Sequence, residues 1–158
     1  MTQIAIFVDV QNIYYTTRQA FGCQFNYRKF WQRVSAQGEI THAYAYAIDR
    51  KDDSQRKFQD ALRHIGFDVK LKPFIQRKDG SAKGDWDVGI TIDVLEAAPK
   101  VDKVILLSGD GDFDLLLRKI KSKFGVKTEV YGIEALTAQS LIAEADQFNG
   151  ILSELLLV

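Results

Sequence analysis

The stretch VILLSGDGDF, residues 104–113, is the most informative part of the chain. Its apolar residues 104–107 predict a strand buried on both faces of a parallel sheet. The serine, glycines and aspartates that follow predict a turn whose backbone comes close to a ligand, because glycine allows sharp turns and close approach. Residues 113–124 then have the spacing of an amphipathic helix. Strand, turn and helix in this order indicate a βα unit.

The same alternation continues in both directions along the chain. Further strands are predicted at residues 4–8, 40–48, 67–75 and 128–131. Further helices are predicted at residues 12–21, after the cap residue Asn26, from Asp52 or Asp53 to Gly66, at 85–98 and at 137–145. We therefore expect one domain, residues 1–158, of the three-layer α/β/α class with a mainly parallel central sheet. Residues 76–84 should form a surface loop.

Composition limits the classes of protein and of site that this chain can represent. The 158 residues include 21 basic and 21 acidic side chains, so the strongly basic footprint of a passive nucleic-acid-binding module is absent. A single cysteine, Cys23, excludes an intrachain disulfide, and only two histidines are present, which argues against zinc sites. We recognise no signal peptide or membrane-spanning run, and therefore expect a cytoplasmic protein.

Aspartates follow two of the predicted strands. Asp9 ends the first strand, and Asp110 and Asp112 follow the strand at 104–107. Since ligands bind beyond the carboxyl ends of parallel strands, we expect these side chains to share one site. Carboxylates a few ångströms apart repel by roughly 4 kcal/mol near a surface, so such a site takes up a cation or shifts their pKa values. Carboxylate oxygens suit Mg²⁺ or Mn²⁺.

Helix capping is the alternative explanation for single acids. Asp112 is a candidate N-cap of the helix that follows it. Asp87 also fits a first-turn acid that interacts with the helix dipole. Asp93 faces either the site or the edge of the core, where a partly buried, hydrogen-bonded acid would explain it equally well. Capping requires one side chain per helix, and it does not explain an Asp-Gly-Asp run opposite Asp9.

Three motifs occur in order: FVDVQN at residues 7–12, KGDWDV at 83–88 with Asp93 after it, and LSGDGDF at 107–113. Together they resemble the NYN domain family, the LabA-like branch of the PIN-like nucleases. The family more often has one residue fewer before the aspartate of the second motif, and a serine where Gly111 stands. The resemblance covers nearly the whole chain and implies a PIN-like α/β/α fold.

The resemblance also implies a Mg²⁺- or Mn²⁺-dependent ribonuclease, a hydrolase in which metal-activated water cleaves an RNA phosphodiester. Carried over to this chain, its catalytic and metal-binding acids are Asp9, Asp87, Asp110 and Asp112. Asn12 would orient the site or hold substrate. The residues that would support the metal ligands are Asp85, Asp93 and Ser108. The extra residue before Asp87 leaves open whether Asp85 shares its role.

RNA contacts are predicted from cations and aromatic residues near these acids. Arg77, Lys78 and Lys83 lie in the loop before Asp87, and Tyr14 and Tyr15 follow Asn12 and could stack on a base. A solvated surface for the cations and ordinary helix packing for the tyrosines are the alternatives. The apolar tail could pack within the domain or against a partner, which leaves a homo-oligomer open.

Two other functions compete with a ribonuclease. A haloacid dehalogenase-type phosphatase also has a late Gly-Asp-Gly motif, but it needs an aspartate two residues after its nucleophile. Here Val10 and Gln11 follow Asp9. A non-catalytic, metal-stabilised RNA-binding or regulatory scaffold would keep the acids and lack turnover. Incubation with RNA in Mg²⁺, Mn²⁺ and EDTA separates these functions.

Overall fold

The computed structural model describes residues 1–73, 75–76, 82–83 and 85–157, with backbone alone at 75–76 and 82–83. The helices are α1 (Val10–Phe21), α2 (Tyr27–Ser35), α3 (Asp53–Ile65), α4 (Asp87–Ala97), α5 (Asp114–Phe124) and α6 (Gln139–Glu144). The strands are β1 (Gln3–Asp9), β2 (Gln24–Phe25), β3 (Glu39–Asp49), β4 (Asp68–Pro73), β5 (Ile75–Gln76), β6 (Ala82–Lys83), β7 (Lys103–Leu107), β8 (Lys127–Gly132), β9 (Gln147–Gly150) and β10 (Leu156–Leu157). Within this described part, no helix combines the length and apolarity that crossing a membrane requires.

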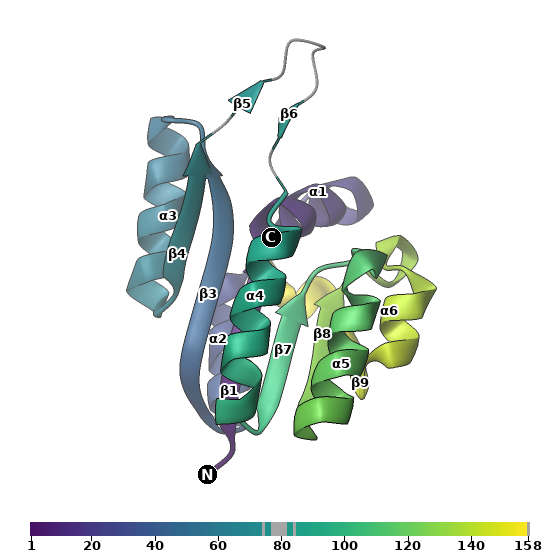
Figure 1. The fold of residues 1–158 in the computed structure, drawn as a ribbon. Helices are drawn as coiled ribbons and strands as arrows, with labels where there is room; N and C mark the ends of the chain where they lie inside the picture. Colours follow the sequence, from purple (N-terminus) through teal and green to yellow (C-terminus); the bar gives the residue numbers. More distant parts are fainter. Residues whose placement is uncertain (74, 77–81, 84, 158) are drawn as a thin grey trace.

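The central sheet has six parallel strands in the order β4-β3-β1-β7-β8-β9 (Figure 1). From β1 the chain builds outward through β3 to β4, then crosses back to β7 and builds outward on the other side. The strand order therefore reverses between β1 and β7. In sheets of this kind, ligands bind at the carboxyl ends of the strands where the order reverses.

Helices cover both faces of this sheet (Figure 1). Successive strand residues point to opposite faces, so Ile4, Ile6 and Val8 pack into a core with α1, α2 and α3. Ala5 and Phe7 enter a second core with α4, α5 and α6. Burial on both faces explains why β1 is a continuous apolar run rather than an alternating one. The expected three-layer α/β/α fold with a parallel sheet is confirmed.

The carboxyl-terminal tail is part of the domain. Ile151 and Leu155 are buried, and β10 pairs with β2 in an antiparallel ladder that joins Leu156 to Phe25. The tail therefore packs within the domain, one of the two alternatives. The segment expected to be a surface loop includes a second short antiparallel pair, β5 with β6. Strands of two residues show no periodicity, so the sequence does not predict them.

Two helix N-caps are those that the sequence predicts. The Asn26 side chain accepts a hydrogen bond from the backbone N–H of Lys29 at 3.0 Å and caps α2. Asp52, rather than Asp53, caps α3 through the N–H of Ser54 at 2.9 Å. Satisfying otherwise unpaired amides in this way stabilises the first turn of each helix.

Other boundaries differ from the sequence prediction. Helix α1 starts at Val10, two residues before the predicted start, and α4 starts at Asp87 rather than Asp85. The prediction of Asp112 as an N-cap is wrong. Its own N–H donates to Asp110 Oδ1 at 2.9 Å, so Asp110 caps the short 3₁₀ turn that leads into α5. The tight Asp-Gly-Asp turn places the cap two residues earlier than helix spacing suggests.

Candidate metal centre

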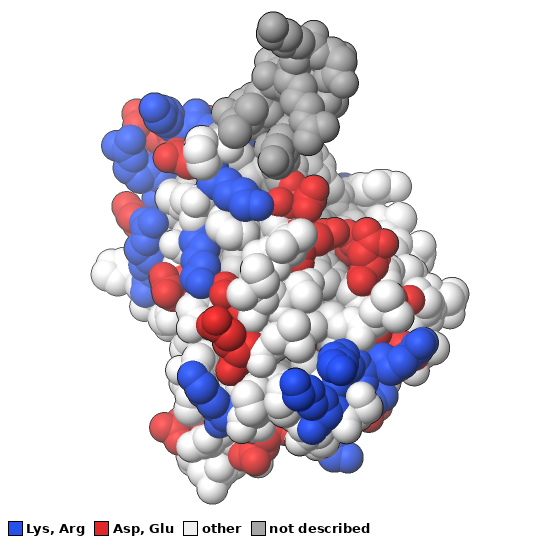
Figure 2. Space-filling model, in the orientation of Figure 1, with Lys and Arg blue, Asp and Glu red and all other residues white. Residues whose placement is uncertain are grey.

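The acids predicted to form the site lie at one edge of the sheet. Asp9 ends β1, Asp110 and Asp112 lie in the turn after the neighbouring strand β7, and Asp87 is the first residue of α4. Figure 2 shows Asp and Glu side chains gathered on this face just below the residues drawn in grey, whereas Lys and Arg gather over the far end of α5. The molecule therefore has an acidic edge where the strand order reverses.

Three carboxylates converge there. One oxygen from each of Asp87, Asp110 and Asp112 lies within 4.8 Å of the other two. Asp87 and Asp110 are partly buried, and Asp112 is exposed. Asp9 is not a member of this group, although the charge of Asp110 acts on it electrostatically. The structure thus joins three of the four predicted ligands tightly and places the fourth beside them.

Ser108 links Asp9 to the turn that holds Asp110. Its buried hydroxyl donates to Asp9 Oδ2 at 3.1 Å and accepts the backbone N–H of Asp110 at 3.2 Å. Asn12 adds a second link, because its Oδ1 accepts the N–H of Gly109 at 2.9 Å. These bonds connect the ends of β1 and β7. The roles of Asn12 and Ser108 toward a metal or substrate stay predictions.

The electrostatics of the site favour a cation. Burial raises the pKa of Asp9 to about 6, while the Ser108 hydroxyl and the backbone N–H of Asn12 partly offset that rise. Burial also raises the pKa of Asp87 to about 7, together with its hydrogen bond to Asp110 and the negative charges of Asp110, Asp85 and Asp9. Removal from water and mutual repulsion both disfavour the ionised forms. A divalent cation would relieve the repulsion by replacing the bound protons.

The donor set fits Mg²⁺ or Mn²⁺. Both ions prefer oxygen ligands, and the converging side chains offer carboxylate oxygens alone. Between described residues, no ion pair neutralises Asp9 or any of the three converging acids. The negative charge of the cluster is therefore not balanced by a described lysine or arginine. The residues at this edge are suited to hold a divalent cation.

Trp86 lies in the second motif, between Asp85 and Asp87. Its indole N–H donates to the carbonyl of Ala47 at 2.9 Å, and its ring lies against Tyr46 with centroids 5.3 Å apart. A Cβ at Gly89 would lie 2.6 Å from the Trp86 ring, so a glycine is required there. Trp86 thereby anchors the beginning of α4 to β3.

Asp85 and Asp87 make different contacts at the beginning of α4. The carboxylate of Asp85 accepts the N–H of Asp87 at 3.2 Å, and its carbonyl accepts Nζ of Lys72 at 2.9 Å. Asp87, not Asp85, is the member of the converging group. Asp85 therefore supports the first turn of α4 and adds negative charge nearby.

Asp93 lies elsewhere on α4. Its Oδ2 accepts the Tyr46 hydroxyl at 2.8 Å and Nζ of Lys70 at 2.7 Å. Lys70 also lies over the Tyr44 ring, 4.7 Å from its centroid. These contacts match the partly buried, hydrogen-bonded acid that was the alternative to a site role.

The predicted RNA-binding residues are not all at the acidic cluster. Tyr14 and Tyr15 are 44% and 54% exposed, and they line a groove beside α1. Arg77 and Lys78 lie outside the described residues, and Lys83 is described by its backbone alone, in β6.

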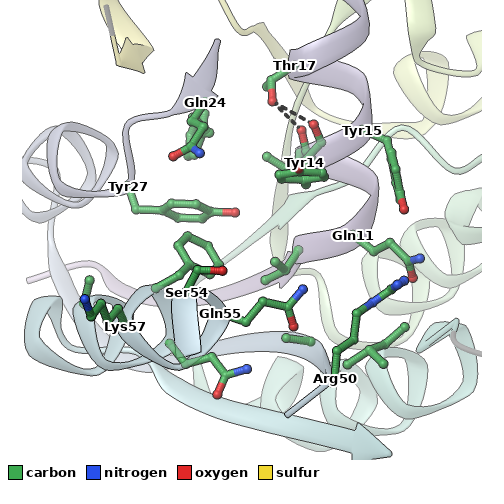
Figure 3. Close-up of a pocket in the computed structure, with 18 of the residues that line it drawn as sticks. Gln11, Tyr14, Tyr15, Thr17, Gln24, Tyr27, Arg50, Ser54, Gln55 and Lys57 are labelled. Carbon is green, nitrogen blue, oxygen red and sulfur yellow. Dashed lines mark hydrogen bonds between the residues drawn. The ribbon is translucent and has the colours of Figure 1, made fainter. Parts of the chain in front are cut away.

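The groove was not predicted from the sequence. It has a volume of about 750 Å³ and lies between α1 and α3 (Figure 3). Gln11, Tyr27 and Gln55 line it. Gln11 belongs to the first motif, whereas Tyr27 and Gln55 occupy ordinary helical positions outside the three motifs. They come from α1, α2 and α3, and the placement of these three helices brings them together.

A three-layer α/β/α fold with an acidic cluster at the point of strand reversal defines a PIN-like, nuclease-type domain. The model of the NYN domain family matches residues 3–152. The chain therefore belongs to the NYN domain family, as the three sequence motifs indicated.

Known proteins resemble this chain along nearly its full length. It is 28% identical over 155 residues to the low amplitude and bright protein LabA of Synechococcus elongatus, which covers 93% of this chain and 82% of LabA. It is 54% identical to a crystallised protein of unknown function from Vibrio parahaemolyticus, with a TM-score of 0.94 over 99% of this chain and 96% of that chain. A ribokinase from Giardia lamblia, 12% identical, has a TM-score of 0.52 over 93% of this chain and 57% of its own, which reflects the α/β fold alone.

Proposed function

We propose that this protein is a Mg²⁺- or Mn²⁺-dependent ribonuclease that hydrolyses RNA phosphodiesters at its acidic edge. The observation that carries the proposal is the convergence of Asp87, Asp110 and Asp112 within 4.8 Å in a chain of the NYN family. Gathering like charges is unfavourable unless a cation balances them. The family of the chain and its PIN-like fold support RNA as the substrate.

The converging acids would hold the ion, with Asp9 beside them as the fourth acid. A bound divalent ion would supply charge for the phosphodiester and lower the pKa of water at the site. The chain itself fixes the geometry. Ser108 holds Asp9, and the N–H of Asp112 holds the Asp110 carboxylate. Such preorganisation avoids rearranging charged groups during the reaction.

The test compares wild type with Asp110→Asn on single-stranded and structured RNA in Mg²⁺, Mn²⁺ and EDTA. Asparagine keeps the Oδ1 that accepts the N–H of Asp112, so the turn survives while a charge is lost. We expect cleavage to require the ion and to disappear in the variant, whereas RNA binding persists. Asp60→Asn, which changes an exposed acid on α3, is the matched control.

A non-catalytic scaffold gives a different result. RNA that binds without being cleaved in Mn²⁺, even at high protein concentration, would overturn the ribonuclease proposal in favour of a metal-stabilised RNA-binding role. Equal cleavage rates for Asp110→Asn and wild type would overturn the proposed site.

A further inference from the structure

The groove between α1 and α3 has the size and lining of a ligand site. Its volume of about 750 Å³ lies within the range of roughly 300–1,000 Å³ that is usual for small-molecule sites. Its lining combines exposed aromatic rings with side-chain amides (Figure 3). Its lining includes Gln11, Tyr14, Tyr15, Tyr27, Arg50 and Gln55.

Tyr27 presents a hydroxyl to this groove from a buried ring. The residue is 7% exposed, and its ring packs edge-on against Phe25 and Phe58 at centroid distances of 4.8 and 5.8 Å. Figure 3 shows the hydroxyl pointing into the groove. Between described residues, no hydrogen bond to this hydroxyl is present. Burial and the charge of Asp9 raise the pKa of Tyr27, so the hydroxyl stays protonated and able to donate. A donor so placed suits a polar ligand.

The groove lies beside Asp9, whose charge acts on the Tyr27 hydroxyl. Val10 and Gln11 line it and directly follow Asp9 in the chain. Ala47, which also lines it, comes one residue after Tyr46, the residue paired with Asp9 across β1 and β3. A strand with one phosphate at the acids would therefore place a neighbouring nucleotide at the groove.

The chemistry of the lining fits a nucleotide. Tyrosine rings stack on any base, and the amides of Gln11 and Gln55 carry both donors and acceptors for a base edge. Among the described lining residues, the charged side chains are Arg50, Lys57 and Asp52. In duplex RNA the base edges are paired, so the ligand is unpaired.

We propose that this groove binds one unpaired nucleotide next to the scissile phosphate, with its base against Tyr14 or Tyr15 and its edge at Gln11, Gln55 and Tyr27. The proposal rests on the proposed ribonuclease function and adds that the substrate is single-stranded where it enters the groove. A free nucleotide shares this chemistry, and the experiment separates the two sources.

The test measures binding of a short fluorescent single-stranded RNA by anisotropy in EDTA, where cleavage is absent. Tyr27→Phe should weaken binding roughly two- to tenfold, as expected for one lost hydrogen bond, and leave the ring packing intact. Tyr15→Ala should weaken it by roughly tenfold through lost stacking. Tyr44→Phe changes a tyrosine that packs with Phe7 in the other core, and should bind like wild type.

Competition identifies the source of the nucleotide. A mononucleotide that displaces the RNA from wild type, and does so less well from Tyr27→Phe, would assign the groove to free nucleotides as well. Displacement by single-stranded but not duplex RNA would assign it to the strand. Unchanged RNA affinity in both Tyr27→Phe and Tyr15→Ala overturns the groove proposal, even if RNA is cleaved in Mn²⁺. Groove-dependent binding without cleavage in any metal overturns only the ribonuclease function.

Discussion

The hydroxyl of Ser108 donates a hydrogen bond to Asp9 at 3.1 Å, across a separation of 99 residues in the chain. The same hydroxyl accepts the N–H of Asp110 at 3.2 Å. One buried side chain thus couples an acid on β1 to the turn after β7. The relative position of Asp9 and Asp110 depends on it.

Replacing Ser108 with alanine should weaken both stability and metal binding. The change leaves the Asp110 N–H and the Asp9 carboxylate without this partner, at a cost of roughly 1–3 kcal/mol in the free energy of unfolding. The pKa of Asp9 should rise, because the hydroxyl lowers it. Urea unfolding in EDTA and a Mn²⁺ titration followed by melting temperature provide the measurements. Ser122→Ala on the exposed surface of α5 is the control, and equal behaviour of the two variants would contradict the role of Ser108.

Asp9→Asn should abolish most of the stabilisation by metal. With free Mn²⁺ about a hundredfold above its Kd, wild type should gain about 2.7 kcal/mol in the free energy of unfolding. In EDTA the variant should be at least as stable as wild type, because a buried carboxylate near other acids has been removed. Thermal melts with and without Mn²⁺ measure both effects. If Asp87→Asn loses the metal response but Asp9→Asn keeps it, Asp9 is not a ligand.

Without metal, the free energy of unfolding should fall as pH rises through the pKa values of Asp9 and Asp87. The ordinary pKa is 3.8, and in the folded protein Asp9 and Asp87 have pKa values of about 6 and about 7. Between these limits the folded state holds protons that the unfolded chain has released, so a rise in pH lowers the free energy of unfolding. Saturating Mn²⁺ should remove this loss because the ion replaces the protons. The readout is the difference between wild type and Asp9→Asn across a pH series in EDTA. A difference that stays constant with pH would refute the assignment.

Gly111→Ala should destabilise the turn between β7 and α5. A Cβ at Gly111 would lie 2.8 Å from Cβ of Ala138, closer than real Cβ contacts, and the strain should cost roughly 1–3 kcal/mol. Adding Ala138→Gly should recover part of this loss in a double-mutant cycle. Gly150→Ala, where the nearest atom would be 3.8 Å away, is the control. If the effects of the two changes are additive, the contact with Ala138 is not the reason that glycine occupies position 111.

The sequence predicts the sheet well because its central strands are buried on both faces. Continuous apolar runs mark β1 and β7, and the acids that follow them are adjacent once the strands are parallel. Spacing could not predict whether Asp85 or Asp87 joins the converging acids. The outcome depends on the contact between Trp86 and the carbonyl of Ala47, 39 residues away. The groove also depends on how α1 and α3 are placed, and its polar residues other than Gln11 lie outside the three motifs.

The pairing of β1 with β7 also affects which surfaces the chain exposes during synthesis. β1 gains its second neighbour only after residues 103–107 have been made, so until then one edge of a strand with five consecutive apolar residues, 4–8, lacks its partner. Pairings of such long range are slow to form and expose apolar surface to aggregation. The acids share this delay, because Asp110 and Asp112 follow β7. A growing chain that has not yet reached Asp112 therefore carries no assembled acidic centre.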